Sequence, residues 1–506
     1  MSTSVSHRPS APPLPATDLR PVAERRRAAA WVLLAALVAA AMWLPFLHRP
    51  LTSDESGFLL LAQQWRPGHS LYGDFWVDRP PLLVGLFALA GHLGAGDATA
   101  AGLVAPGLKL LGAAASGTSV ALAGVLVGMV APAGRRVPRT PLVLAVALLS
   151  SPLLGMPEVD GEVLAVPFVL LGLVCLVAAM RTPWGWRALG LCVGAGAAGM
   201  AAALVKQNVV DVFVFGIVLV AVSRGRLPRV QVRLTAIAAI AAGAVVVLGT
   251  TLAAAWAHGT TIPELWDAVV LFRGRAADVI DASSSAATPL RGAGIAAAAV
   301  GSGAAVVLVV AVVRILRSRH PLAWPVLALT AWETFAIAAG GSYWLHYLTG
   351  IVPGLVLLVA VARPGSGRAL TRAVAYTAAA TLTAWTYLVV APTPHSPEAQ
   401  VSTYLREHSH SRADGVVVGF GHAEIVAASG LHSPYEYLWS LPVRVRDPHL
   451  ARLRGVLAGA SAPRWVVVDG GSLDTWGLEA DNAQQYLLRH YVERVSYDNW
   501  HVWERR

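Results

Sequence analysis

Long apolar runs separated by short polar segments are the main pattern along the 506-residue chain. The first run, residues 24–47, places arginines before about 20 apolar residues, which is the length that a membrane-spanning helix needs. Ten further runs occupy residues 98–131, 141–156, 163–180, 188–205, 209–222, 234–257, 291–313, 321–339, 345–361 and 373–391. This pattern predicts a polytopic, all-α membrane protein with about 11 transmembrane helices.

Two shorter apolar stretches, residues 56–65 and 80–95, follow the first run. The second begins with two prolines and carries His92, and it is short for a membrane span. We expect both to be interfacial helices within an outer loop of residues 48–97. If residues 80–95 crossed the membrane instead, every later topological assignment would reverse.

The composition changes after residue 392, where charged residues and histidines become frequent. Residues 415–421 and 464–471 have the pattern of buried strands, residues 481–491 that of a helix, and residues 492–505 that of a hairpin. Glycines after the two strands could indicate nucleotide binding, but no G-x-G-x-x-G opens a helix, so we interpret them as turns. The sequence predicts a small α/β domain over residues 393–506, after a transmembrane module over residues 25–392.

Composition supports the membrane class, because 56% of the residues are hydrophobic and 13% are charged. A soluble domain carries roughly twice that charged fraction. Cys175 and Cys192 both lie inside apolar runs, so a disulfide framework or a thiolate metal site is not indicated. The net charge of +10 is not interpreted as a nucleic-acid signal, because the arginines form short clusters between apolar runs.

These arginine clusters predict the topology, since positive charge gathers in cytoplasmic loops. Residues 1–24 are expected to be a disordered cytoplasmic tail. Eleven spans then place the 393–506 domain outside the cytoplasmic (plasma) membrane. The clusters comprise Arg25, Arg26 and Arg27; Arg135, Arg136 and Arg139; Arg181 and Arg187; Arg224, Arg226, Arg229 and Arg233; Arg314, Arg317 and Arg319; and Arg363, Arg368 and Arg372.

Two adjacent acids, Asp54 and Glu55, lie just beyond the first predicted span, in the outer loop. A partly desolvated carboxylate has a higher proton affinity and can accept a proton from an attacking hydroxyl. Arg79, beside the double proline of the same loop, suits the binding of a phosphate through several hydrogen bonds. The alternative is that both acids are ordinary solvated loop residues.

A second acidic group, Glu158, Asp160 and Glu162, falls between two outward-facing helix ends. Such a cluster can bind a divalent cation or orient a polar acceptor. A solvated turn is the alternative interpretation.

The chain has two lysines, Lys109 and Lys206, and both lie in or at the end of apolar runs. An ionisable residue at membrane depth is a candidate for function. Lys206 is followed by Gln207 and Asn208, a polar break that the topology places on the outer side. For both lysines, snorkelling to the interface is the alternative.

Aromatic residues and a histidine, Tyr343, Trp344, His346 and Tyr347, mark the start of another apolar run on the predicted outer side. Aromatic residues are common at every membrane interface. His346 on the inner face of the bundle would be a plausible donor to a phosphate or a sugar. We expect these groups, the acids and the cationic residues to face one outward pocket at lipid level.

The segment DESGFLLLAQQWRPGHSLYGDFWVDRPPLL, residues 54–83, resembles the GT-C superfamily of polytopic glycosyltransferases. The resemblance is to the branch with protein O-mannosyltransferases, aminoarabinose transferases and Rgt-type transferases, a glycosyltransferase family 39-like group. It rests on D-E, an interfacial helix, G-x-x-x-Y and a basic residue before P-P-L. Weaker support comes from the acidic loop near Asp160, K-Q-N at 206–208 and HYLTGIVP at 346–353.

The resemblance implies inverting transfer of a sugar from a polyprenyl-phosphate donor to a glycan, lipid or protein acceptor of the cell envelope. Asp54 matches the first acid of the motif and would be the general base, with Glu55 orienting the acceptor or a cation. The donor phosphate would be held by Arg79, Lys206 and His346. Other positions placed in the pocket are Lys109, Gln207, Asn208, Tyr343 and Tyr347, with Glu158 and Asp160 near the acceptor or a possible divalent cation.

A transporter or flippase of a polyprenyl-linked or small polar substrate is the main alternative, because intramembrane charges also line translocation paths. Against it stand the outer loop with two interfacial helices and the outer domain. A membrane anchor for a soluble binding domain would not explain Lys206 or Arg79.

Overall fold

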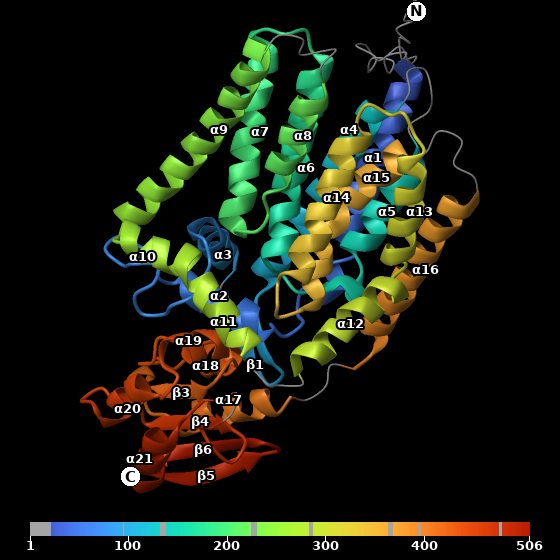
Figure 1. Ribbon diagram of the computed structural model, residues 1–506. Coiled ribbons are helices and arrows are strands. Elements are labelled where there is room, and N and C mark those ends of the chain that lie inside the picture. Colours follow the sequence, from blue (N-terminus) through green and yellow to red (C-terminus); the bar gives the residue numbers. More distant parts are fainter. Residues whose placement is uncertain are drawn as a thin grey trace, which may run out of the picture.

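The computed structural model describes residues 22–94, 96–131, 138–223, 230–282, 287–362, 368–392, 396–474 and 478–506. These residues form a bundle of helices with a small α/β layer at one end (Figure 1). Most of the predicted cytoplasmic tail lies outside the described residues. So do six of the arginines used for the topology: Arg135, Arg136, Arg224, Arg226, Arg229 and Arg363.

Among the described residues, six helices are long and apolar enough to cross a membrane. A seventh candidate is a pair of helices bent by 66°, α12 (Ala287–Gly301) and α13 (Ala304–Leu316). The six are α1 (Val22–Ala41, continued by the short helix η1, Leu44–Phe46), α4 (Pro106–Val130), α6 (Gly161–Arg181), α7 (Trp186–Val205), α9 (Val230–Ala257) and α16 (Arg368–Val390).

Four further predicted spans are helical but short, at 10–17 residues. They are α5 (Arg139–Leu149), α8 (Asp211–Val222), α14 (Ala323–Ala338), and the η4 and α15 pair (Leu345–Ile351 and Val352–Val361). The helical character of the predicted runs is confirmed. The number of about 11 spans stays a prediction, because these four are shorter than the usual spanning length.

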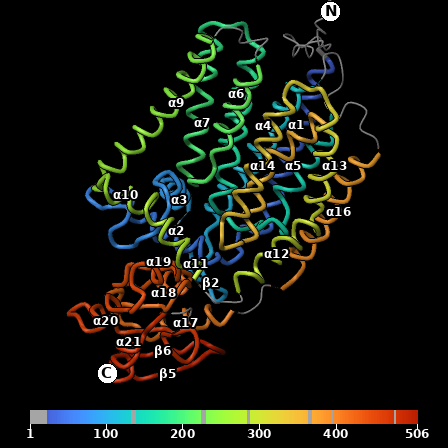
Figure 2. The backbone as a smooth tube through the Cα atoms, in the orientation of Figure 1, coloured from blue at the N-terminus to red at the C-terminus, as the bar shows by residue number. Residues whose placement is uncertain are grey.

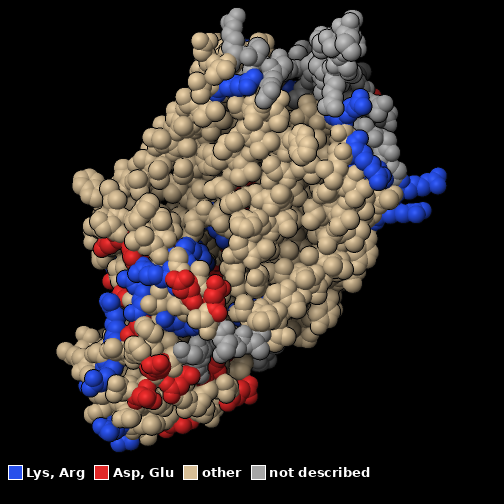
Figure 3. Space-filling model, in the orientation of Figure 1, with Lys and Arg blue, Asp and Glu red and all other residues tan. Residues whose placement is uncertain are grey.

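Apolar side chains cover the outside of the bundle. Leu33 on α1 is 61% exposed and Val245 on α9 is 64% exposed. Outward apolar surface of this extent suits contact with lipid. In Figure 3, a wide band without Lys, Arg, Asp or Glu lies between basic side chains at one end and mixed charges at the other.

Helices α7 and α9 approach closely through small residues. A Cβ atom added at Gly196 would lie 1.8 Å from the carbonyl oxygen of Ile240, and one added at Gly243 would lie 1.9 Å from that of Val193. Such contacts allow backbones to pack tightly where the hydrophobic effect cannot drive association. This helix pair is therefore held by backbone-to-backbone packing.

The outer loop differs from the prediction at its ends. Asp54 and Glu55 were expected in a loop, but α2 (Ser53–Ala62) begins before them, because Thr52 and Glu55 form a capping box. The second predicted interfacial helix is α3 (Pro81–Leu93). The run 98–131 starts with a hairpin of β1 (Asp97–Thr99) and β2 (Gly102–Val104), because the helix begins only at Pro106.

Residues 258–290, which lie between the predicted spans 234–257 and 291–313, are largely helical where the structure describes them. They contain α10 (Ile262–Trp266), the π-helical η3 (Asp267–Leu271), α11 (Phe272–Asp281) and the start of α12. Helix α11 packs against α19 (Ser440–Arg446) of the C-terminal part. The segment therefore connects the bundle to the sheet layer.

The predicted strands, helix and hairpin of the C-terminal part are all present. The sheet has the order β3-β4-β6-β5, with β3 (Val416–Gly419) parallel to β4 (Trp465–Asp469) and an antiparallel hairpin of β5 (Tyr491–Tyr497) and β6 (Trp500–Arg505). The remaining helices are η2 (Pro152–Leu154) in the bundle and α17 (Pro397–His408), η5 (Arg412–Asp414), α18 (Ala423–Ser429), α20 (Ala451–Ala458) and α21 (Asp481–His490) in the C-terminal part.

The sheet layer lies at the end of the bundle opposite the start of α1, next to α2 and α11 (Figure 2). Helix α18 packs directly on α2, and the hydroxyl of Ser53 bridges the two parts. It donates to the carbonyl of Gly421 at 2.6 Å and accepts from the N–H of Ala423 at 3.1 Å. The first residue of α2 is thereby fixed to the C-terminal part.

Candidate active site

Glu55 is fully buried, and its two carboxylate oxygens are occupied. Oε1 accepts from Lys109 Nζ at 2.5 Å and from the N–H of Val159 at 2.8 Å, while Oε2 accepts from the N–H of Thr52 at 3.0 Å. Lys109 Nζ also donates to the carbonyl of Pro157 at 2.9 Å. This pair joins α2, α4 and the acidic loop, and neither charge faces open space.

Asp54 is half-buried beside the C-terminal part. The indole N–H of Trp439 donates to its Oδ1 at 2.7 Å. The same indole lies over Gly57, where an added Cβ atom would approach a ring carbon to 2.4 Å, and its centroid is 5.4 Å from that of Phe58. Trp439 thus covers one side of the first turn of α2.

The surroundings of Asp54 favour its protonated form. Burial raises the pKa of Asp54, and the nearby Glu158 carboxylate raises it further. His346, Arg79 and the Trp439 hydrogen bond act in the opposite direction. A carboxyl group with a raised pKa next to cationic groups is suited to accept a proton.

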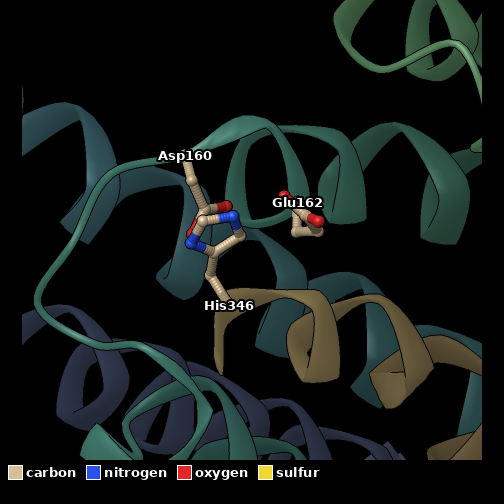
Figure 4. A group of neighbouring side chains, drawn as sticks. All are labelled: Asp160, Glu162 and His346. Atoms are coloured by element: carbon tan, nitrogen blue, oxygen red, sulfur yellow. The ribbon is translucent and has the colours of Figure 1, made fainter. Parts of the chain in front are cut away.

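The acidic loop meets His346. The imidazole Nδ1 lies 3.7 Å from Glu158 Oε2 and 3.8 Å from Asp160 Oδ2. Figure 4 shows His346 and Asp160 directed toward each other, with Glu162 on the first turn of α6. Gly155, with φ of +102°, lets the loop pass this close, because an added Cβ atom would lie 2.8 Å from the His346 Cα.

Asp160 also organises the start of α6. Its Oδ1 accepts from the N–H of Val163 at 2.9 Å, so the residue caps the helix. Burial raises the pKa of Asp160, with His346 acting against that shift.

Lys206 forms a buried ion pair with Glu162. Its Nζ also lies 4.3 Å from the centroid of the Tyr347 ring. Since Lys206 follows the last residue of α7, the ion pair joins the adjacent ends of α6 and α7.

Arg79 belongs to a cluster with Asp78 and Arg273. Asp78 Oδ1 accepts from Arg79 Nη1 at 2.7 Å, and its Oδ2 lies 2.9 Å from Arg273 Nη2. Burial alone would raise the pKa of Asp78, but the two guanidinium groups outweigh it and lower the pKa. The cluster carries one net positive charge, and Arg79 is close enough to act electrostatically on Asp54.

The other predicted positions are distributed around this cluster. Gln207 donates from Nε2 to the carbonyl of Asp78 at 3.1 Å, and Asn208 and Tyr347 line a cavity next to Lys206. Tyr343 lies elsewhere, since its hydroxyl donates to the carbonyl of Ala338 and its ring faces Gly292 of α12.

Sequence reasoning did not identify Asp78, Arg273 or Trp439. Asp78 directly precedes Arg79 in the sequence D-R-P-P, and this position next to a candidate residue could have identified it. Arg273 and Trp439 lie far away in sequence, in segments that showed no recognisable motif.

Asp160, Glu162 and His346 each offer a ligand atom within 4.8 Å of the other two. Two carboxylate oxygens and an imidazole nitrogen are a donor set that suits Zn²⁺ or Mn²⁺. These residues fit a divalent cation by their chemistry, although Lys206 already supplies a counter-charge to Glu162.

The arrangement therefore combines a half-buried carboxylate, a guanidinium pair and an acidic cluster with a histidine. They come from α2, the loop before α3, α11, α6 and η4. Such a set can remove a proton from a hydroxyl and stabilise an anionic leaving group.

No protein-family model matches the chain, and no curated protein matches it. Solved structures do. ArnT from Cupriavidus metallidurans bound to undecaprenyl phosphate is 11% identical, with a TM-score of 0.63, covering 94% of this chain and 98% of that one. The apo state of the same ArnT is 12% identical, with a TM-score of 0.56, and the match again covers 94% of this chain and 98% of that one.

The archaeal oligosaccharyltransferase AglB from Archaeoglobus fulgidus, in complex with an inhibitory peptide and a dolichol-phosphate, is also similar. It is 12% identical, with a TM-score of 0.54, covering 89% of this chain and 70% of that one. At such identities the likeness establishes the fold. The chain therefore has the fold shared by ArnT and AglB, which agrees with the fold that the resemblance of residues 54–83 implies.

Proposed function

We propose that this protein is a membrane glycosyltransferase that uses a polyprenyl-phosphate-linked sugar donor. The observation that carries the proposal is that Asp54 and Arg79 belong to neighbouring segments: Asp54 lies on α2, and the Arg79 guanidinium, just before α3, lies 5.8 Å from the ring centroid of Phe58 on α2 and acts electrostatically on the Asp54 carboxylate. A lipid-linked donor has its reacting bond at the headgroup level, so a base and a phosphate ligand are needed there. The GT-C fold supports the same conclusion.

In the proposed reaction, Asp54 takes the proton of an acceptor hydroxyl. The hydroxyl oxygen forms a bond to the anomeric carbon, and the bond from that carbon to the phosphate oxygen breaks. The polyprenyl phosphate leaves with the electron pair, and the configuration at the anomeric carbon inverts. Trp439 is a positioning residue, because its hydrogen bond orients the carboxylate.

Arg79 is the principal phosphate ligand in this proposal. Its Nη1 is held by Asp78, and a guanidinium has further N–H donors for phosphate oxygens. Arg273, held on the other oxygen of Asp78, is proposed as a second phosphate ligand. Lys206 and His346 are closer to the acidic cluster, so we assign them a secondary electrostatic role on the leaving phosphate.

Glu158 and Asp160 are proposed to orient the acceptor or to contribute to a cation site. A divalent cation held by Asp160, Glu162 and His346 would supply positive charge near the departing phosphate. Glu55 and Lys109 are proposed to hold α2 against the acidic loop, since both charges are buried in a mutual pair.

The acceptor is proposed to be a cell-envelope glycan, lipid or protein on the outer side of the plasma membrane. The N-terminus would then be cytoplasmic and the sheet domain of residues 393–506 extracytoplasmic. In support of this, the basic side chains at the N-terminal end of the bundle are followed by an uncharged band in Figure 3.

The test is sugar transfer from undecaprenyl-phosphate-linked sugars by the purified protein, together with glycan and lipid profiling of cells with and without the gene. Asp54→Asn should abolish transfer, with accumulation of one lipid-linked sugar and loss of one envelope glycan. Asp74→Asn is the matched control, because Asp74 lies in the same loop with its side chain 58% exposed. Full activity of Asp54→Asn, or substrate movement across vesicles without transfer, would contradict the proposal.

A further inference from the structure

Helix α19 of the C-terminal part packs against α11, the helix that carries Arg273 (Figure 1). Arg446, the last residue of α19, makes three contacts with its guanidinium. Nη1 donates to Asp267 Oδ2 at 2.7 Å, Nε donates to the hydroxyl of Tyr437 at 3.2 Å, and Cζ lies 4.4 Å from the centroid of the Trp76 ring. With 28% of its side chain exposed, Arg446 is largely enclosed by these partners.

Trp76 lies where the segments of the two proposed phosphate ligands meet. It precedes Arg79 by three residues in the loop before α3, and it is 4% exposed. Its ring packs edge to face on Phe272 of α11, with the two centroids 4.7 Å apart. Phe272 directly precedes Arg273. Because a close-packed interior transmits displacements, a shift of this indole would move the backbone of both arginines.

Asp267 connects Arg446 to the same helix by charge. Its carboxylate lies in η3, directly before α11, and accepts from Arg275 Nη2 on one oxygen and from Arg446 Nη1 on the other. Arg275 follows Arg273 by two residues on α11. The start of α11 is therefore tied to the end of α19.

Further contacts join the segment of residues 436–446 to the bundle. The N–H of Trp76 donates to the carbonyl of Glu436 at 3.0 Å, and Arg444 Nη2 donates to the carbonyl of Val279 in α11 at 3.2 Å. Trp439, in the middle of the segment, donates to Asp54 on α2. One stretch of the C-terminal part thus contacts α2, the loop before α3, and α11.

We propose that Arg446 is a positioning residue for Arg79 and Arg273. Through Trp76 and Asp267 it fixes the loop before α3 and helix α11 at the separation that one phosphate group requires. A direct role as a phosphate ligand suits Arg446 less, because its guanidinium already donates twice and covers the indole. The inference rests on the proposed function and deepens it, since it makes the C-terminal part a component of the phosphate site.

The test measures the binding of undecaprenyl phosphate to the full-length protein in detergent. Arg446→Met removes a positive charge and keeps an apolar stem over Trp76, whereas Asp267→Asn removes a negative charge at nearly constant shape. If net charge alone mattered, Asp267→Asn would strengthen phosphate binding, but loss of positioning should weaken it. Thermal unfolding checks that each variant is folded, and Asp267→Asn carries the test if Arg446→Met is not.

Arg464 and Asp414 provide matched controls within the C-terminal part. The Arg464 side chain is 25% exposed, its Nη1 donates to Asp414 Oδ2 at 2.9 Å, and its Cζ lies 4.9 Å from the centroid of the Trp465 ring. This pair has the same chemistry as Arg446 and Asp267. Arg464→Met and Asp414→Asn should leave the affinity for undecaprenyl phosphate unchanged.

We expect Arg446→Met and Asp267→Asn each to weaken binding about fivefold. In an Arg79→Gln background the further loss from Arg446→Met should be smaller, because a positioning residue acts through the side chains that it places.

Tighter binding by Asp267→Asn, an unchanged affinity in both variants, equal losses in the matched controls, or an undiminished loss in the Arg79→Gln background would refute the role of Arg446. Each of these outcomes would leave the donor assignment intact. If undecaprenyl phosphate does not bind the wild-type protein, the proposed function fails and the inference fails with it.

Discussion

The indole N–H of Trp439 donates a hydrogen bond to Asp54 Oδ1 at 2.7 Å across 385 residues of sequence. Asp54 lies in the first turn of α2, and Trp439 belongs to the C-terminal part that carries the sheet. The proposed base is therefore completed by a residue outside the helical bundle. This contact leads to two predictions.

Trp439→Phe should lower sugar transfer about tenfold, which corresponds to about 1.4 kcal/mol of activation free energy. Phenylalanine retains an aromatic ring over Gly57 but removes the N–H donor. Trp500→Phe is the control, because Trp500 is a buried tryptophan of the same part whose N–H donates to Glu398 at 3.2 Å. Equal losses in both variants would point to a general effect on folding.

Activity should fall as the pH drops through the raised pKa of Asp54, because the base must be ionised. Since burial raises that pKa, the pH at which the rate is half-maximal should lie above 3.8, the ordinary pKa of an aspartate. Removal of the Trp439 donor destabilises the carboxylate and should move this limb to still higher pH. A pH–rate profile of wild type and Trp439→Phe checks both statements, and an unchanged limb would contradict the second.

Lys109→Met should destabilise the protein by about 3–5 kcal/mol, because it leaves the buried Glu55 carboxylate without its cation. Combining it with Glu55→Leu should cost much less than the sum of the two single changes. Denaturant unfolding in detergent measures these free energies. Strict additivity would show that the pair is not coupled.

Arg79→Gln should weaken the binding of undecaprenyl phosphate about tenfold or more. Arg273→Gln should have a smaller effect, because the Arg273 side chain is 38% exposed and that of Arg79 is 22% exposed. Arg66→Gln controls for net charge, since Arg66 is 57% exposed in the same loop. A loss of equal size in Arg66→Gln would indicate non-specific electrostatics.

Topology is open to cysteine labelling. Ala282, after α11, should react from outside when replaced by cysteine, whereas Pro183, between α6 and α7, should react from the cytoplasmic side. Both positions are exposed. The native Cys175 and Cys192 lie within α6 and α7 and provide the background to subtract. Labelling with the opposite sidedness would overturn the assignment from the arginine clusters.

Much of the fold followed from hydropathy, because a bilayer demands long apolar helices and their sequence signal is strong. Alternating apolar residues and β-branched residues likewise predicted the strands β3 and β4 and the hairpin of β5 and β6. The capping box of Thr52 and Glu55 was also readable in the letters T-S-D-E, although Asp54 and Glu55 were expected in a loop.

The site was less predictable, because its members meet only through tertiary packing. Asp54, Arg79, Lys206 and His346 stood out as polar residues in apolar surroundings. Trp439 and Arg273 lie in polar segments without a recognisable motif. Nothing in the neighbouring sequence indicates that Trp439 contacts Asp54 on α2 or that Arg273 pairs with Asp78.

The docking of Ser53 and Asp54 onto residues 421–439 has a consequence for biogenesis. The ribosome makes the whole helical bundle, through Val390, before the indole that holds the carboxylate has been synthesised. A nascent chain that has inserted the helices α1 to α16 therefore lacks the contact that orients the proposed base. Until the C-terminal part folds against α2, a newly inserted molecule should be unable to consume the lipid-linked pool.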